Sequence, residues 1–255
     1  MRRSSVAIAL VMLSLLLASC AGEQAATKKA RTDSQYNLGL AHLSGGDAKQ
    51  AIVQFSHAIA EDPDNPTLHN ALGLAYLLDR RIDLATASFQ KAVKLDPKFS
   101  DAYNNLGSAY VQRAQYDQAI EVFKRALTNP AYLNPEQAHL NLANVYVVKG
   151  RLAESIEEFK RALDVSPDFA EAHNRLGYVY LVQGRAELAI AELTLALKQA
   201  PELVTAHQSL GFALLLAGQK ERAKQAFQKV VELSPTGEMA AEAMRQLKQL
   251  NQLPQ

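Results

Sequence analysis

The chain is poor in sulfur and has no tryptophan. Cys20 is the only cysteine among 255 residues, so no internal disulfide can form. Lysine plus arginine total 27 and aspartate plus glutamate total 26, which leaves no basic surplus to neutralise nucleic-acid phosphates. The sequence has no HExxH, no GxSxG and no phosphate-binding glycine loop. We therefore expect no enzyme, no nucleic-acid binder and no small-molecule substrate.

The first residues have the pattern of an export signal. Arg2 and Arg3 precede an apolar run from Val6 to Leu17, which is too short to span a bilayer because a spanning helix needs ~20 apolar residues. Small residues then lead to Cys20. Two interpretations of this junction are open: an ordinary cleavage site that happens to lie beside a cysteine, or a site at which the cysteine is modified.

The stretch Leu17-Ala18-Ser19-Cys20 resembles the bacterial lipobox. The resemblance implies that residues 1–19 are a lipoprotein signal peptide, that the Cys20 thiol receives a diacylglycerol, and that the new amino terminus is acylated. Several acyl chains together anchor a protein durably. We expect residues 20–31 to be a lipidated tether, because AGEQAATKKAR is small and polar without apolar periodicity. No other cofactor and no metal is expected.

A 34-residue pattern runs through most of the remaining chain. It contains LGxxY, then AxxxFxxA, then a closing proline, and the copy in 66–99 shows it best: Leu72, Gly73, Tyr76, Ala85, Phe89, Ala92 and Pro97. The pattern resembles the tetratricopeptide (TPR) repeat, which implies an all-α solenoid of helical hairpins. Six repeats are expected at 32–65, 66–99, 100–135, 136–169, 170–203 and 204–237, followed by a capping helix at 238–250.

Glycine occupies two kinds of position in this pattern. Small residues at Gly73, Gly107 and Gly177 let the first helix of a hairpin approach the second. A second group falls in the turn between the two helices, where a positive φ is often required: Gly46, Gly150, Gly184 and Gly218.

The junction between the third and fourth repeats is irregular. The sequence TNPAYLNPEQ, 128–137, has Ala131 in place of the closing proline and adds two residues to the period. We expect the stack to be bent or loosened there. Tyr132 and Leu133 lie in this loop, and two interpretations are open: they pack under the hairpin, or they face a partner.

Four of the six histidines occupy the fourth position of a repeat: His69, His139, His173 and His207. Equivalent positions on stacked repeats are at least one helix-packing distance apart, ~8–10 Å, whereas zinc ligands lie within ~2 Å of one ion. The pattern favours packing residues over metal ligands.

The second face of the first helix in each hairpin predicts a partner-binding groove. In a TPR this face carries repeat positions two, five, nine and twelve, and here these positions hold no lysine or arginine. They are apolar with several asparagines, which suits an amphipathic protein segment. Position twelve can instead be buried within the hairpin, so positions five and nine carry most of the prediction. The candidate groove residues are Tyr36, Leu40, Leu43, Asn70, Leu74, Leu77, Asn104, Ser108, Val111, Leu140, Asn144, Asn174 and Tyr178.

A lipobox, a short tether, six TPRs and a terminal helix together resemble the type IV pilus pilotins, the PilF/PilW/Tgl group. The resemblance implies an outer-membrane lipoprotein that faces the periplasm and binds the secretin to promote its localisation or multimerisation. Ala21 fits this location, because some lipoproteins retained at the inner membrane carry aspartate there. Two alternatives stay open. One is a general envelope scaffold for cell-wall or outer-membrane assembly, and the other is a targeting module that recruits an envelope hydrolase or glycosyltransferase.

Overall fold

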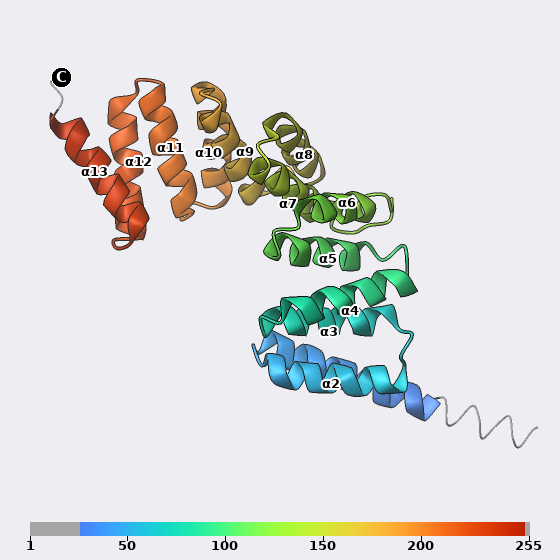
Figure 1. Cartoon of the computed structure of the whole chain (residues 1–255). Coiled ribbons are helices and arrows are strands. Elements are labelled where there is room, and N and C mark those ends of the chain that lie inside the picture. Colours follow the sequence, from blue (N-terminus) through green and yellow to red (C-terminus); the bar gives the residue numbers. More distant parts are fainter. Residues whose placement is uncertain (1–25, 253–255) are drawn as a thin grey trace, which may run out of the picture. The chain divides into compact units, whose positions relative to one another are not determined.

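The computed structural model describes residues 26–252, which form thirteen helices and no β-strand (Figure 1). The order is that of six consecutive helical hairpins and one final helix, as the repeat pattern predicts. The first helix covers residues 26–44, and the others are α2 Ala48–Glu61, α3 Pro66–Leu78, α4 Ile82–Leu95, α5 Ser100–Gln112, α6 Tyr116–Ala126, α7 Pro135–Val148, α8 Leu152–Val165, α9 Ala170–Val182, α10 Ala186–Gln199, α11 Val204–Leu216, α12 Lys220–Leu233 and α13 Glu238–Gln252. They divide into two compact units: unit 1 ends at Gln115 and unit 2 begins at Tyr116.

The first helix starts earlier than the sequence suggested. Residues 26–31 were expected to belong to the tether, but they are helical. The physical reason is that Ala, Lys and Arg are strong helix formers, and tertiary contacts extend the helix toward its start. The Thr32 hydroxyl donates to the carbonyl of Lys28, and Arg31 pairs with Glu61 of α2 at 3.2 Å. The predicted signal peptide, Cys20 and the first tether residues lie outside the described range.

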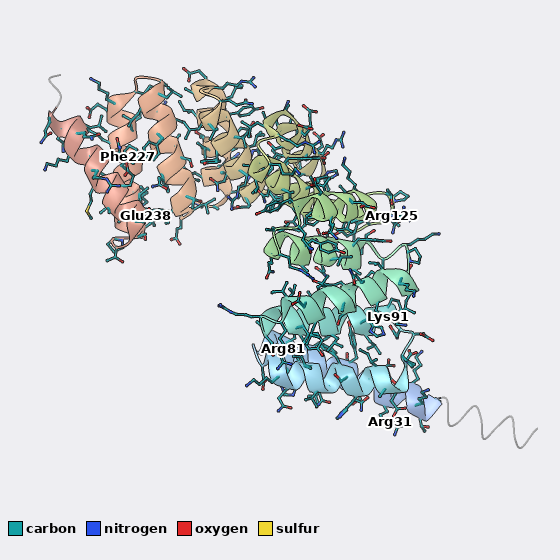
Figure 2. All side chains as sticks on the ribbon, in the orientation of Figure 1. Arg31, Arg81, Lys91, Arg125, Phe227 and Glu238 are labelled. Carbon is teal, nitrogen blue, oxygen red and sulfur yellow. The ribbon has the colours of Figure 1, made fainter. Side chains whose placement is uncertain are left out.

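Within each unit, the hairpins close on a large side chain of the second helix. Phe55, Phe89, Phe159 and Phe227 are fully buried, and Figure 2 marks Phe227 on α12. A Cβ built on Gly73 would lie 2.5 Å from Cε1 of Phe89, so the ring packs directly against the backbone of α3. In the fourth hairpin the equivalent position is Ala143, which is also fully buried.

The turns inside the hairpins use a left-handed residue. Gly46, Gly150, Gly184 and Gly218 have φ between +72° and +78°, as the sequence predicted. Arg80 and Ala114 occupy the same place in the second and third repeats, with φ of +60° and +57°. A side chain disfavours this conformation by ~1–2 kcal/mol, so these two turns are strained relative to the others.

Successive hairpins stack within each unit. In unit 1, α2 packs against α3 and α4 against α5, and the core includes Ala51, Phe55, Ala71 and Ala75. In unit 2, α8 packs against α9 and α10 against α11, while α13 covers α12 as the terminal helix (Figure 1). Each hairpin thus buries an apolar face that it could not bury alone.

The irregular loop lies inside unit 2, between α6 and α7. Its backbone is held by Asn129, whose side-chain Oδ1 accepts from the amide of Ala131 at 3.0 Å and whose carbonyl accepts from the amide of Tyr132 at 3.1 Å. Helix α6 still packs against α7. The loop therefore takes up the two added residues without separating these helices. Tyr132 is half-buried, which fits packing under the hairpin. Leu133 is 88% exposed, which fits a side chain that faces a partner.

Candidate protein-binding surface

The first helices of the hairpins place the predicted groove residues at the surface of unit 1. The helix over 26–44, α3 and α5 carry positions five, nine and twelve, and α3 lies against α5. We define the unit 1 inner surface as the members that are half-buried or exposed: Tyr36, Leu40, Leu43, Leu74, Leu77, Asn104, Ser108 and Val111. Leu40 is 37% exposed. Tyr36 is held in place by Phe55, with ring centroids 5.9 Å apart.

Two of the predicted asparagines are occupied by neighbouring helices. Asn70 is buried, and its Oδ1 accepts from Nδ2 of Asn105 on α5 at 2.9 Å. Asn174 is buried as well, and its Nδ2 donates to the hydroxyl of Thr205 on α11 at 3.2 Å. The prediction is wrong for these two as freely available ligands, because the next first helix lies against position five. They join successive hairpins through hydrogen bonds.

Leu140 also differs from its predicted role. It is 5% exposed and belongs to the core of unit 2, where α7 packs against α9. A partner cannot reach it without unpacking this core. In unit 2 the accessible members of the predicted set are therefore Asn144, which is half-buried, and Tyr178, which is 46% exposed.

The structure adds apolar residues that the repeat pattern did not select. They lie at position thirteen, the last residue of the first helix, where Leu78, Val148, Val182 and Leu216 are each about half exposed. Val182 follows Tyr178 by four residues and therefore shares its helix face. We call Val148, Tyr178, Val182 and Leu216 the unit 2 inner surface. The sequence signal was available, because an apolar residue recurs here in four of the six repeats.

Charge is sparse on these inner surfaces and is paired close by. Glu171, at the start of α9, accepts from Nε of Arg175 at 2.7 Å. Elsewhere in unit 2, the Arg151 guanidinium lies over the Tyr146 ring and donates to Glu154, and this hydrogen bond lowers the pKa of the Glu154 carboxyl. Arg175 precedes Tyr178 by three residues on α9, so a compensated charge lies one helical turn from this exposed ring.

The position-four histidines contact carbonyl and carboxylate oxygens. Nε2 of His69, His173 and His207 lies 2.8–2.9 Å from the carbonyl of the proline six residues earlier. His139 follows the irregular loop, where the residue six positions earlier is Leu133, and its Nδ1 lies 2.6 Å from Oε2 of Glu158. In residues 26–252 no three His, Cys, Asp or Glu side chains come together as a metal site. No helix in that range is long and apolar enough to cross a bilayer.

Family models match most of the repeat region. A tetratricopeptide repeat model matches residues 70–134, 104–168 and 140–204, and a second one matches residues 204–236. A further TPR model matches residues 39–79. The chain belongs to the tetratricopeptide repeat family. TPR proteins are in general scaffolds for protein–protein interaction rather than enzymes, which agrees with accessible apolar inner surfaces.

Solved TPR structures reproduce this fold at low sequence identity. The structure of PilF from Pseudomonas aeruginosa is 18% identical, with a TM-score of 0.78 over 86% of this chain and 99% of that one. PilW, described as a widely conserved type IV pilus biogenesis factor, is 20% identical, with a TM-score of 0.76 over 84% and 98%. YrrB, a TPR protein with an unusual peptide-binding site, is 21% identical, with a TM-score of 0.60 over 75% and 97%. No curated protein sequence matches the chain.

Proposed function

We propose that this protein is a pilotin, an outer-membrane lipoprotein of type IV pilus biogenesis. In this proposal a lipid on Cys20 anchors the chain to the outer membrane, and the TPR hairpins face the periplasm. The unit 1 inner surface binds a segment of the secretin and promotes its localisation or multimerisation.

The observation that carries the proposal is the coincidence of two independent features. The first is the stretch Leu17-Ala18-Ser19-Cys20 ahead of the repeats, which resembles a lipobox. The second is a TPR array whose full length corresponds to PilF and PilW, since 98–99% of each of those chains is covered. The identity of 18–20% supports the fold alone, so the link to the pilus depends on the two features together.

The chemistry of the unit 1 inner surface fits an amphipathic client segment. Leu40, Leu74 and Leu77 offer apolar contacts, while Asn104 and Ser108 add polar groups beside them. Ser108 donates its own hydroxyl to the carbonyl of Asn104 at 3.2 Å, so its oxygen keeps acceptor capacity. Unassembled secretin strands have apolar faces and unpaired edges that need covering until they join the ring.

The extent of the first helix limits the distance between Cys20 and the folded unit. The first helix already includes residue 26, so at most residues 21–25 lie between Cys20 and the folded unit. Five residues reach at most ~18 Å at ~3.5 Å per residue. A lipid on Cys20 would therefore hold unit 1 against the bilayer, and such tethering raises the effective concentration of its surface near membrane-bound client.

The deciding experiment measures the SDS-resistant secretin multimer in membranes of a deletion strain beside its parent. Loss of multimer with retained monomer is the expected result, and the parent gene should restore it. Leu40→Asp with Leu74→Asp should fail to restore it, because each change places a charge on the apolar surface. The matched control is Leu84→Asp, which charges a leucine of similar exposure on α4. Unchanged circular dichroism must accompany each variant.

An unchanged multimer in the deletion strain would refute the pilotin role and leave the TPR scaffold with another envelope client. Crosslinking from Leu74 then identifies that client. A cell-wall or outer-membrane assembly protein would point to a general scaffold, whereas a hydrolase or glycosyltransferase would point to a targeting module.

The anchor has its own test. Cys20→Ala should move the protein out of the membrane fraction, because the proposed lipid is attached through that sulfur. Flotation of membranes on a density gradient measures this directly. If Cys20→Ala floats with membranes as the parent does, Cys20 is not the anchor.

A further inference from the structure

Helix α10 differs from the other second helices of unit 2 on its outer face. It packs against α9 and α11, and its buried residues are Ala189, Ile190, Leu193 and Ala196. The opposite face exposes Leu188, Ala191 and Leu195, and the two leucines are 39% and 43% exposed. The spacing of three and four residues places all three on one stripe, as in the seam of a coiled coil. We call these three residues the α10 stripe.

The same repeat positions on the neighbouring helices are polar. They hold Gln118, Glu121 and Arg125 on α6, Glu154, Glu157 and Arg161 on α8, and Arg222, Gln225 and Lys229 on α12. Figure 2 shows Arg125 projecting from α6. A repeat fold does not require apolar residues here, because three sister helices in the described part of unit 2 do without them. The α10 stripe is thus an apolar centre flanked by charged helices, which is the composition of an interface core and rim.

Two charges flank the stripe in a self-complementary arrangement. Glu187 lies just before Leu188, and Lys198 lies one turn beyond Leu195. At 100° per residue both project to the same side of the stripe. Both are exposed, and within residues 26–252 neither takes part in an ion pair. One end of the stripe is therefore acidic and the other basic.

We infer that α10 is a homodimer contact in which two copies of this chain pair their α10 stripes antiparallel about a two-fold axis. In that arrangement Leu188 meets Leu195 of the second copy, and Ala191 meets its own equivalent at the axis. Glu187 meets Lys198 of the second copy on the same side of the seam. A two-fold axis repeats every contact, so one stripe supplies both halves of the interface.

The small residue at the centre makes this pairing testable by disulfide trapping. Packed helix axes lie ~8–10 Å apart, and each Cα is ~2.3 Å from its axis, which leaves ~3.5–5.5 Å between facing Cα atoms. A disulfide forms when Cα atoms lie within ~7 Å. A single helix pair buries less than the ~800 Å² per partner of a standard interface, so the dimer exchanges rapidly and trapping suits it.

The experiment uses the full chain in isolated membranes, with Ala191→Cys as the engineered thiol and mild oxidation before a non-reducing gel. The chain without an engineered thiol reports any dimer formed through Cys20. Ala87→Cys is the matched control, because Ala87 is an exposed alanine at the same repeat position on α4. We expect a disulfide dimer with Ala191→Cys and only the background level with Ala87→Cys. Equal trapping of the two variants overturns the inference.

Charge exchange tests the antiparallel register. In an Ala191→Cys background, Glu187→Lys places two lysines together and should lower the dimer yield about three- to fivefold, on the scale of a flanking ion pair. Adding Lys198→Glu reverses both charges and should restore the yield. Leu195→Glu should lower it at least about tenfold, because it places a charge in the apolar seam. Failure of the double exchange to restore trapping, or crosslinking of Ala191→Cys to a different protein in place of a dimer, refutes the homodimer.

Discussion

Close packing of a phenylalanine on a glycine should make Gly73 intolerant of even one methyl group. Gly73→Ala places Cβ 2.5–2.8 Å from three ring atoms of Phe89, whose side chain is fully buried. Overpacking of this kind costs ~1–3 kcal/mol. Alanine in a helix recovers ~0.5–1 kcal/mol relative to glycine. The net expectation is a loss of ~1–2 kcal/mol, which corresponds to a roughly five- to thirtyfold rise in the open population of this hairpin.

Hydrogen exchange read by mass spectrometry measures this locally, since peptides of α3 and α4 report their own opening free energy. Peptides of α11 and α12, in unit 2, serve as the internal reference. Gly45→Ala is the matched control, because a Cβ there meets nothing closer than 3.4 Å and φ is not positive. That variant should leave the exchange of α3 and α4 unchanged.

A double-mutant cycle separates the clash from other effects. Phe89→Ala alone should cost ~3–5 kcal/mol through the cavity it leaves. Combined with Gly73→Ala, the new methyl enters that cavity, so the pair should be less destabilised than the sum by ~1–3 kcal/mol. Additive effects, or slower exchange in Gly73→Ala alone, would refute the packing argument.

Three further substitutions test a strained turn and the position-four histidines. Ala114→Gly should raise the midpoint of thermal unfolding, because it relieves up to ~1–2 kcal/mol of left-handed backbone strain at Ala114. The greater entropy of glycine in the unfolded chain offsets part of this gain. An unchanged or lower midpoint in a thermal melt contradicts the prediction. His173→Phe should cost ~1–3 kcal/mol in urea unfolding, since it leaves the Glu192 carboxylate and the Pro167 carbonyl without their partners. His69→Phe removes only the contact with the Pro63 carbonyl and should lower the free energy of unfolding by less than His173→Phe does. Equal losses would argue against a stabilising role of the Glu192 carboxylate.

The repeat architecture could be predicted from the sequence because its signals are local. The spacing of Ala85, Phe89 and Ala92 defines one face of a helix, and glycine at 150, 184 and 218 marks turns that need a positive φ. Each hairpin meets only its neighbours, so a pattern of 34 residues contains most of the information that the fold requires. The candidate groove residues were assigned to the first helices of the hairpins in the same way, and most of them are half-buried or exposed there.

The accessibility of individual residues required the tertiary structure. Leu140 and Leu40 belong to the same predicted face, yet packing of α7 against α9 buries the former while the latter stays exposed. Asn70 and Asn174 have the composition of peptide ligands, but their partners are thirty-one or thirty-five residues away in sequence. Burial depends on what the next hairpin places opposite, and a single repeat does not contain that information.

The sequence by itself determined an all-α TPR array of six hairpins with a covering helix. The helical periodicity, the residues of the turns and the repeat length are all local features of the sequence. Only the tertiary structure decided that residues 26–31 continue the first helix, that Val148, Val182 and Leu216 stay about half exposed, and that α10 exposes an apolar stripe. The physical reason is that local sequence sets the conformation of a helix, whereas the neighbouring helices decide which of its faces remains in contact with water.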